Sequence, residues 1–124
     1  MRIYPMCEGG STLDIETRMQ DGIQIVKLTG RFCMGTPLDR FNAAMGELIR
    51  QSHSKIILDL EGVPTIDSSG IGLLARYLAS AKQSGGNIRL LNPSKFTHQA
   101  LKMVGLLNLF STYADLSQAV ASFQ

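Results

Sequence analysis

The sequence lacks an apolar run of the ~18–20 residues that a helix needs to cross a bilayer. Its first residues, Met1–Met6, also lack the apolar segment of a secretory signal. Charge of one sign is not concentrated in any run, because 12 Lys and Arg and 10 Asp and Glu are spread along the chain. A nucleic-acid binder usually gathers its basic residues in one run or on one face. We therefore expect a cytoplasmic protein that neither inserts into a membrane nor binds nucleic acid.

Cysteine is scarce, and the two that are present, Cys7 and Cys33, do not have Cys-x-x-Cys spacing. They are interpreted as reduced thiols, since a disulfide fits poorly with a cytoplasmic chain. Together with His53 and His98 they show no ligand spacing, so no metal is expected. The chain also lacks a Walker-type Gly-x-x-x-x-Gly-Lys run, so no phosphate-cradling loop or cofactor is expected.

The signature of a serine hydrolase is missing as well. Ser68 is the serine of interest below, but the residue two positions before it is Ile66, whereas a nucleophile elbow has glycine there. The two histidines, the only candidate bases, lie near expected helix ends among polar neighbours. Histidines in such places are usually solvated or cap the helix. We expect that the protein is not an enzyme.

What the sequence does contain is the composition of one globular domain: 124 residues, of which 44% are hydrophobic and 18% charged. Residues 1–12 show no sustained periodicity and are interpreted as a flexible leader, with the domain at 13–124. Strands are expected near 13–19, 23–28, 55–60, 87–91 and 109–113. Helices are expected near 37–51, 68–83, 93–105 and 115–123.

Local signals support these elements. Asp21-Gly22 is a favoured hairpin dipeptide, and Pro37 suits a first helical turn with Thr36 as its N-cap. Gly85-Gly86 is a helix stop signal. The third helix is expected to turn an apolar face inward, made of Phe96, Ala100, Leu101 and Val104.

The order of the elements predicts the fold class. Helices separate the later strands, which requires crossover connections and hence parallel pairing. The expected fold is a single α/β domain with an opening β-hairpin. Its sheet is mixed but mostly parallel, with about five strands and about four helices.

The most informative stretch is Lys55–Leu60, a buried strand, followed by a loop and the corner Asp67-Ser68-Ser69-Gly70. Helix capping alone explains Asp and Ser here, since both accept hydrogen bonds from first-turn amides and contribute ~1 kcal/mol. A second interpretation remains open beside it. A serine at the carboxyl end of a strand is exposed where α/β proteins place their sites, and Gly70 and Gly72 lower the side-chain relief so that a partner can approach.

Phosphorylation of such a serine would add about −1.5 to −2 charges. The helix N-terminus favours that charge by up to ~1 kcal/mol, whereas the adjacent Asp67 repels it. Because the local effects oppose each other, we expect the modification to act on a docked partner rather than on the fold.

These residues resemble the STAS domains, and most closely the stand-alone anti-sigma factor antagonists of bacteria. The resemblance covers roughly Leu13–Phe123 and is most specific at Ile57–Leu60 and Ile66–Leu74. It implies a non-enzymatic switch with Ser68 as phosphoacceptor, flanked by partner-binding Asp67, Ser69, Gly70 and Gly72. The implied partners are an anti-sigma factor that is also a serine kinase, and a phosphatase. Binding of the unphosphorylated form would release a sigma factor.

The sequence departs from the family at the end of the second strand. The family often has Gly, an acidic residue, an aliphatic residue and Asp there, and this aspartate assists partner contact. The match here is Gly30-Arg31-Phe32-Cys33. We expect Gly30, Arg31 and Cys33 to contribute to partner binding, with Arg31 stabilising a phosphorylated Ser68. The alternative function is an unphosphorylated STAS scaffold in a signalling or transport assembly.

Overall fold

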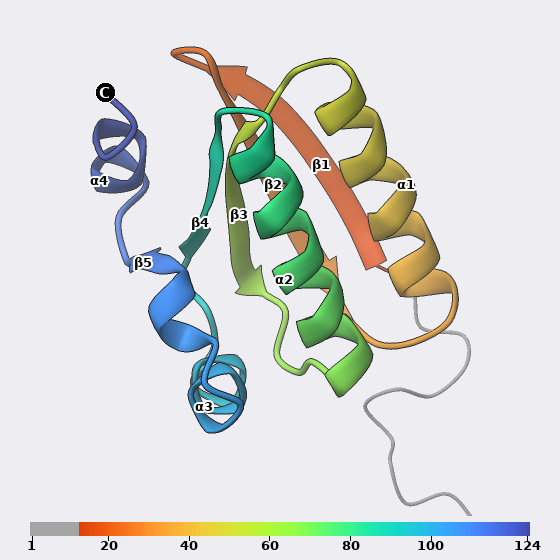
Figure 1. Cartoon of the computed structure of the whole chain (residues 1–124). Helices are drawn as coiled ribbons and strands as arrows, with labels where there is room; N and C mark the ends of the chain where they lie inside the picture. The colour runs from red at the N-terminus through yellow and green to blue at the C-terminus, as the bar shows by residue number, and fades with distance from the viewer. Residues whose placement is uncertain (1–12) are drawn as a thin grey trace, which may run out of the picture.

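Five strands form one sheet in the order β1-β2-β3-β4-β5 (Figure 1). The structure is a computed structural model that describes residues 13–124; the expected leader, residues 1–12, lies outside the described residues. The strands are β1 (Leu13–Gln20), β2 (Ile23–Gly30), β3 (Lys55–Gly62), β4 (Asn87–Leu91) and β5 (Ser111–Tyr113). The helices are α1 (Thr36–Arg50), α2 (Ser68–Gln83), α3 (Lys95–Met103), the short 3-10 helix η2 (Leu107–Leu109) and α4 (Leu116–Ala121).

The sheet opens with the expected hairpin. β1 and β2 pair antiparallel from Leu13 opposite Gly30 to Gln20 opposite Ile23. Asp21 and Gly22 connect them with φ of 53° and 79°. Both central residues of the turn thus adopt the left-handed conformation that suits the twist of a two-residue hairpin, which Asp-Gly adopts readily.

The remaining pairs, β2 with β3, β3 with β4 and β4 with β5, are parallel. Each parallel strand is reached through a crossover, as the sequence predicts. α1 and α2 cover one face of the sheet, α4 lies towards the other face, and α3 lies at the end of the sheet where β3 and β4 finish (Figure 1). The predicted fold class and hairpin are therefore confirmed.

The core divides between the two faces. The larger cluster joins alternate residues of the strands to the inner sides of α1 and α2, with Leu101 of α3 at its edge. The smaller cluster joins Ile25 and Ile57 on the other face to Ala119 and Val120 of α4. None of the helices within residues 13–124 is long and apolar enough to cross a membrane.

The start of α1 differs by one residue from the prediction. Thr36 is already helical, and the N-cap is Gly35, which makes no side-chain capping bond. Gly35 has φ of 107°, a conformation that glycine adopts without the strain of a Cβ. Backbone geometry at the preceding turn, which no local pattern reveals, therefore decides where the helix begins.

The inward face predicted for α3 is wrong at both ends. Phe96 and Val104 have 42% and 55% of their surface exposed, whereas Thr97 and Leu101 are fully buried. Thr97 has polar partners in this inner position, because Ser94 caps the helix by accepting from the Thr97 amide and its hydroxyl also bonds the Thr97 hydroxyl. A polar residue with its own partner is buried at little cost, and the apolar Phe96 remains outside.

Candidate functional site

Two loops meet where β2 and β3 end. The loop after β2 and the loop before α2 run side by side, joined by a parallel bridge between Phe32 and Ile66. The Asp67 amide donates to the Phe32 carbonyl oxygen at 3.4 Å. Phe32 is fully buried and packs edge-on against Phe41 of α1, with ring centroids 4.7 Å apart. The loop that departs from the family pattern therefore lies directly beside the start of α2.

Asp67 ties the two loops together with both of its carboxylate oxygens. It is the N-cap of α2, where Oδ1 accepts from the Gly70 amide at 2.9 Å. Oδ2 accepts from the Met34 amide, also at 2.9 Å, across 33 residues of sequence. The capping role that the sequence predicts is confirmed. The second bond goes beyond it, because it fixes the loop after β2 against the helix.

Ser68 is the first residue of α2, and its side chain is exposed, whereas Ser69 is half-buried. Within residues 13–124, the amides of Ser68 and Ser69 have no acceptor, as is usual for the first turn of a helix. Such amides and the helix dipole together favour a negative charge. The structure thus presents an accessible hydroxyl at a position where a phosphate would find free donors.

The two glycines of the corner do different things. A Cβ on Gly70 would lie 2.7 Å from the Phe32 carbonyl oxygen, so Gly70 lets the start of α2 pack closely on the neighbouring loop. A Cβ on Gly72 would meet nothing within 4 Å, and this residue is exposed. Of the two, Gly72 is the one that leaves open space for an approaching partner.

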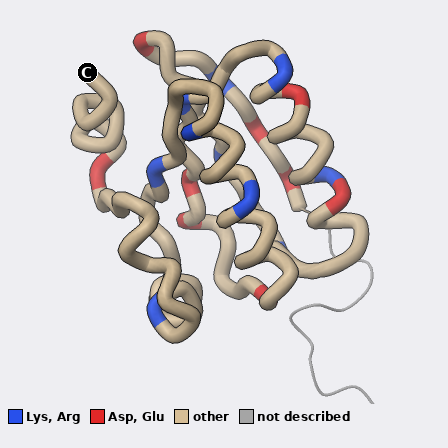
Figure 2. The backbone as a smooth tube through the Cα atoms, viewed as in Figure 1, with Lys and Arg blue, Asp and Glu red and all other residues tan. Residues whose placement is uncertain are grey.

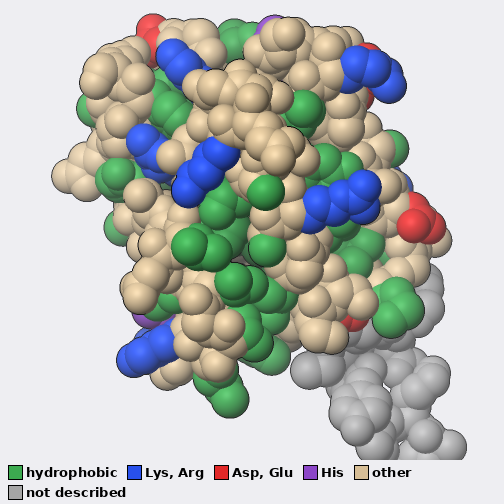
Figure 3. Space-filling view, viewed as in Figure 1, with side chains coloured by type: hydrophobic (Ala, Val, Ile, Leu, Met, Phe, Trp, Pro, Cys, Tyr) green, Lys and Arg blue, Asp and Glu red, His purple; other side chains and the backbone are tan. Residues whose placement is uncertain are grey.

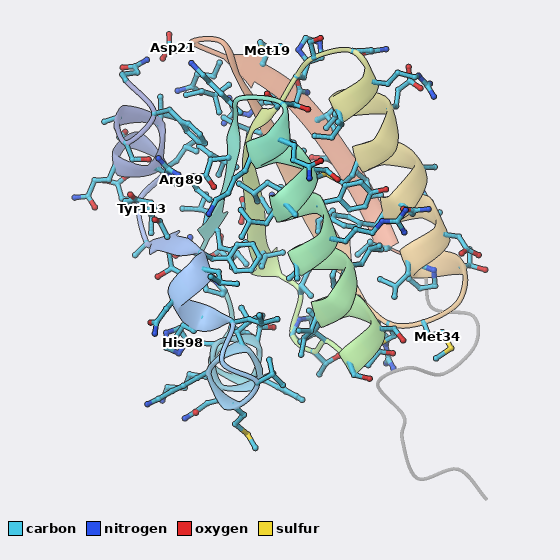
Figure 4. All side chains as sticks on the ribbon, viewed as in Figure 1. Met19, Asp21, Met34, Arg89, His98 and Tyr113 are labelled. Carbon is cyan, nitrogen blue, oxygen red and sulfur yellow. The ribbon has the colours of Figure 1, made fainter. Side chains whose placement is uncertain are left out.

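The loop after β2 presents its residues unequally. Gly30 has φ of 125°, Arg31 is half-buried, and Cys33 is buried with 2% of its surface exposed. Met34, which sequence reasoning missed, has 71% of its side chain exposed and lies at the same end of the molecule as the start of α2 (Figure 4). A methionine in a loop gives no periodic signal, so its exposure could not be predicted from the sequence. The position of its backbone becomes clear only from the bond between its amide and Asp67.

The interpretation of Cys33 as a reduced thiol is wrong, because Cys33 is disulfide-bonded in the structure. The other cysteine of the chain, Cys7, lies outside the described residues. Cys-x-x-Cys spacing reports on local redox and zinc motifs. It carries no information about disulfides between distant positions, which depend on the distance and the orientation of the two cysteines in the fold.

The arrangement is that of a known domain family. The model of the STAS domain matches residues 14–119, which is most of the chain. This protein belongs to the STAS domain family.

Curated and solved relatives of this STAS domain carry related descriptions. The anti-sigma F factor antagonist of Paenibacillus polymyxa is 28% identical over 90% of this chain and 96% of its own length. The structure of an anti-sigma factor antagonist from Mycobacterium paratuberculosis superimposes with a TM-score of 0.80 at 21% identity, covering 90% of this chain and 93% of that one. The structure of the Bacillus cell fate determinant SpoIIAA in its phosphorylated form superimposes with a TM-score of 0.71 at 22% identity, covering 90% of this chain and 100% of that one. The likeness to the solved structures shows the shared fold.

The histidines of this STAS domain do not join the corner. His53 precedes β3 and Ser68 follows it, so a strand of roughly 25 Å separates them. His98 lies on α3 and lines a shallow hollow of about 360 Å³ with Asn92 and Tyr113 (Figure 4). Within residues 13–124 no three His, Cys, Asp or Glu side chains are grouped as metal ligands would be.

Proposed function

We propose that this STAS domain is an anti-sigma factor antagonist that acts as a phosphorylation-controlled binding switch, with Ser68 as the phosphoacceptor. The observation that carries the proposal is the exposed Ser68 hydroxyl at a helix start held in place by Asp67. The descriptions of the relatives support it. The role is regulatory rather than enzymatic.

The proposed partner is an anti-sigma factor that is also a serine kinase. It binds the unphosphorylated domain and so releases its sigma factor. It also catalyses transfer of the terminal phosphoryl group of ATP to the Ser68 oxygen, forming an O–P bond as the hydroxyl proton and ADP leave. A phosphatase resets the switch by hydrolysing that bond. The domain itself supplies only the acceptor and the docking surface.

The contacts of Asp67 explain why the switch acts on docking. Both carboxylate oxygens already accept hydrogen bonds, so the residue is held in position when a dianion forms next to it. The free amides of the first turn favour that dianion. The helix start therefore persists, whereas a docked partner would have to bury two negative charges against its own surface, which is strongly unfavourable without a matching cation.

The proposal gives the expected partner-binding residues different roles. Ser69 and Gly72 are accessible enough to contact a partner beside Ser68, and Arg31, half-buried in the loop after β2, is proposed to contact it from there. Gly30 ends β2 with a positive φ and so directs this loop towards the corner. Gly70 and Asp67 contribute indirectly by holding the two loops together, and the buried Cys33 contributes from within the loop after β2.

The test is phosphorylation with each purified anti-sigma factor of the kinase type from the source organism, in the presence of Mg²⁺ and ATP. Intact-mass analysis is expected to show one added phosphoryl group in the wild type and in the matched control Ser69→Ala, and none in Ser68→Ala. Arg31→Ala is expected to shorten the lifetime of the phosphorylated form, since the proposal assigns Arg31 the cation that stabilises the phosphoserine. A mass gain that persists in Ser68→Ala, or its absence with every kinase, would refute the switch.

A further inference from the structure

The segment from α3 to η2 exposes more large apolar side chains than any other part of the described chain. Six large hydrophobic residues are exposed within residues 13–124, and four of them lie between positions 96 and 109. These four define the α3–η2 patch: Phe96 (42% exposed), Met103 (84%), Val104 (55%) and Leu109 (50%). Single exposed hydrophobic residues are ordinary, but four within 14 residues of chain make this segment a candidate interaction surface.

The patch follows from the pattern of α3. Phe96 and Met103 are seven residues apart, which places them on one outer face of the helix. Thr97 and Leu101 form the buried face. A helix with apolar residues on its outer as well as its inner side is the pattern of a helix that is covered on both sides. One side of α3 is covered by the domain, and the other is open.

The stretch of chain that contains the patch carries charge of one sign. Between Ser68 and Ala114 the sequence contains five Lys and Arg and no Asp or Glu. Figure 2 shows the corresponding part of the backbone, from α2 to β5, without acidic residues. Lys95 and Lys102 are exposed on α3 itself, whereas Arg76 is exposed halfway along α2 and Lys82 at its far end.

The space-filling view shows the same arrangement on the surface. Hydrophobic side chains gather over the middle and lower part of the face that carries α2, with basic side chains among them and acidic ones mainly at its margin (Figure 3). A partner that covers this surface has to supply apolar side chains and negative charge. Basic side chains at the rim of an apolar patch select such a partner and speed its association.

The patch is continuous with the candidate site. The Ser94 hydroxyl, at the start of α3, donates to the Pro64 carbonyl oxygen at 3.2 Å. Pro64 belongs to the loop that leads from β3 to Asp67 and Ser68. α3 and the start of α2 lie at the same end of the molecule (Figure 1). A partner seated over Ser68 would therefore reach α3 without crossing another element.

We propose that the α3–η2 patch docks an acidic, amphipathic segment of a protein partner. The chemistry of the patch is independent of the proposed function. Only the assignment of this segment to the partner that docks at Ser68 rests on that function. Phosphorylation of Ser68 would place a dianion at the end of the molecule that carries α3 and so repel an acidic partner from the patch as well.

The first experiment tests the patch itself. The probe is a synthetic helical peptide of about 20 residues, long enough to form a helix, with Leu on one face and Glu on the other. It is titrated into the ¹⁵N-labelled domain. Amide shifts are expected at positions 95–109. Met103→Ser is expected to weaken peptide binding about tenfold, as for a truncated anchor residue. Lys102→Glu is expected to weaken it a few-fold, and this effect should decrease as the salt concentration is raised.

Matched controls lie elsewhere on the domain. Met19 on β1 is 48% exposed at the other end of the molecule (Figure 4), and Met19→Ser is expected to change nothing. Lys55→Glu, at the exposed start of β3, controls for net charge. The proposal would be overturned if a Leu/Lys peptide bound as tightly as the Leu/Glu peptide, or if phosphatidylserine vesicles bound more tightly than that peptide. It would also be overturned if the patch were closed by self-association of the domain, or if no amide at 95–109 shifted.

The second experiment separates the patch from the switch. Met103→Ser and Met19→Ser are compared for affinity towards the kinase that phosphorylates Ser68. A loss confined to Met103→Ser supports docking of that partner on the patch, and equal affinities overturn this assignment. If no kinase phosphorylates Ser68 while the Leu/Glu peptide still binds at 95–109, the proposed function fails and the docking surface stands.

Discussion

At the scale of single residues, Asp67 organises the site. One carboxylate oxygen caps α2, a role that the sequence predicts because aspartate before a helix is a common cap. The other binds the Met34 amide, 33 residues away, and no local pattern predicts that bond because it depends on how β2 and β3 pair. The exposure of Ser68 is likewise expected from its place in the chain. The exposure of Met34 and the disulfide state of Cys33 depend on the tertiary fold.

Gly70 and Gly72 provide a matched pair of substitutions. Gly70→Ala would place a Cβ 2.7 Å from the Phe32 carbonyl oxygen, so we expect it to lower the free energy of unfolding by about 1–3 kcal/mol. In Gly72→Ala the added Cβ would have no atom within 4 Å, so this variant should raise the free energy of unfolding by up to about 1 kcal/mol, since alanine favours the helix. Urea denaturation measures both. Equal stability of the two variants would contradict the close packing of the two loops.

At the scale of elements, periodicity predicts the strands and helices well but not the orientation of α3. Alternation and turn signals locate β1, β2 and the hairpin, because each depends on neighbouring residues. In α3 apolar residues occur on two faces, so spacing alone cannot tell which face packs inward. Leu101 packs inward as predicted, but Thr97 is buried beside it with the Ser94 cap as its polar partner, and Phe96 stays outside. The two residues that the pattern misplaces, Phe96 and Val104, belong to the α3–η2 patch.

Tyr77 joins α2 to α1 and provides a test of how the two helices are held. Its hydroxyl donates to the Asn42 carbonyl oxygen at 2.9 Å and also contacts the Asn42 side-chain oxygen. Tyr77→Phe removes the donor while keeping the ring, which packs edge-on against Phe41. We expect the free energy of unfolding at neutral pH to fall by about 1 kcal/mol. No loss on urea denaturation would mean that this bond does not hold the helices together.

The same residue predicts a dependence on alkaline pH. Burial raises the pKa of Tyr77 above its usual value of about 10, and nearby Arg76 lowers it by a smaller amount. The unfolded chain therefore loses the phenol proton first, so the free energy of unfolding should fall as the pH rises above about 10. In Tyr77→Phe, the part of this loss of stability that comes from the phenol should be absent. The matched control Tyr113→Phe should lose stability above about pH 10 as the wild type does. Identical profiles for the two variants would refute the assignment.

At the scale of the whole molecule, the charges are segregated although they look evenly spread in the sequence. The described acidic residues lie on the part of the chain before Ser68 and at Asp115, whereas α2, β4 and α3 carry only basic residues and η2 and β5 carry no charge (Figure 2). Ser68 lies at the boundary between the two parts. A negative charge added there stands next to the last acidic residue before a stretch that carries only basic ones, so it extends the negative potential towards that stretch.

This segregation leads to a prediction about the phosphorylated domain. Because Asp67 keeps both of its bonds and the helix start favours the added charge, the modified and unmodified domains should melt at nearly the same temperature. Amide shifts between the two should be confined to positions 31–35 and 66–72. Affinity for the kinase partner should nevertheless fall about a hundredfold or more, as expected for burying an unpaired charge. Unphosphorylated Ser69→Ala controls for a simple change at the helix start. Shifts that spread through β4 and α4, or a domain that unfolds on phosphorylation, would mean that the switch acts through the fold instead of the docking surface.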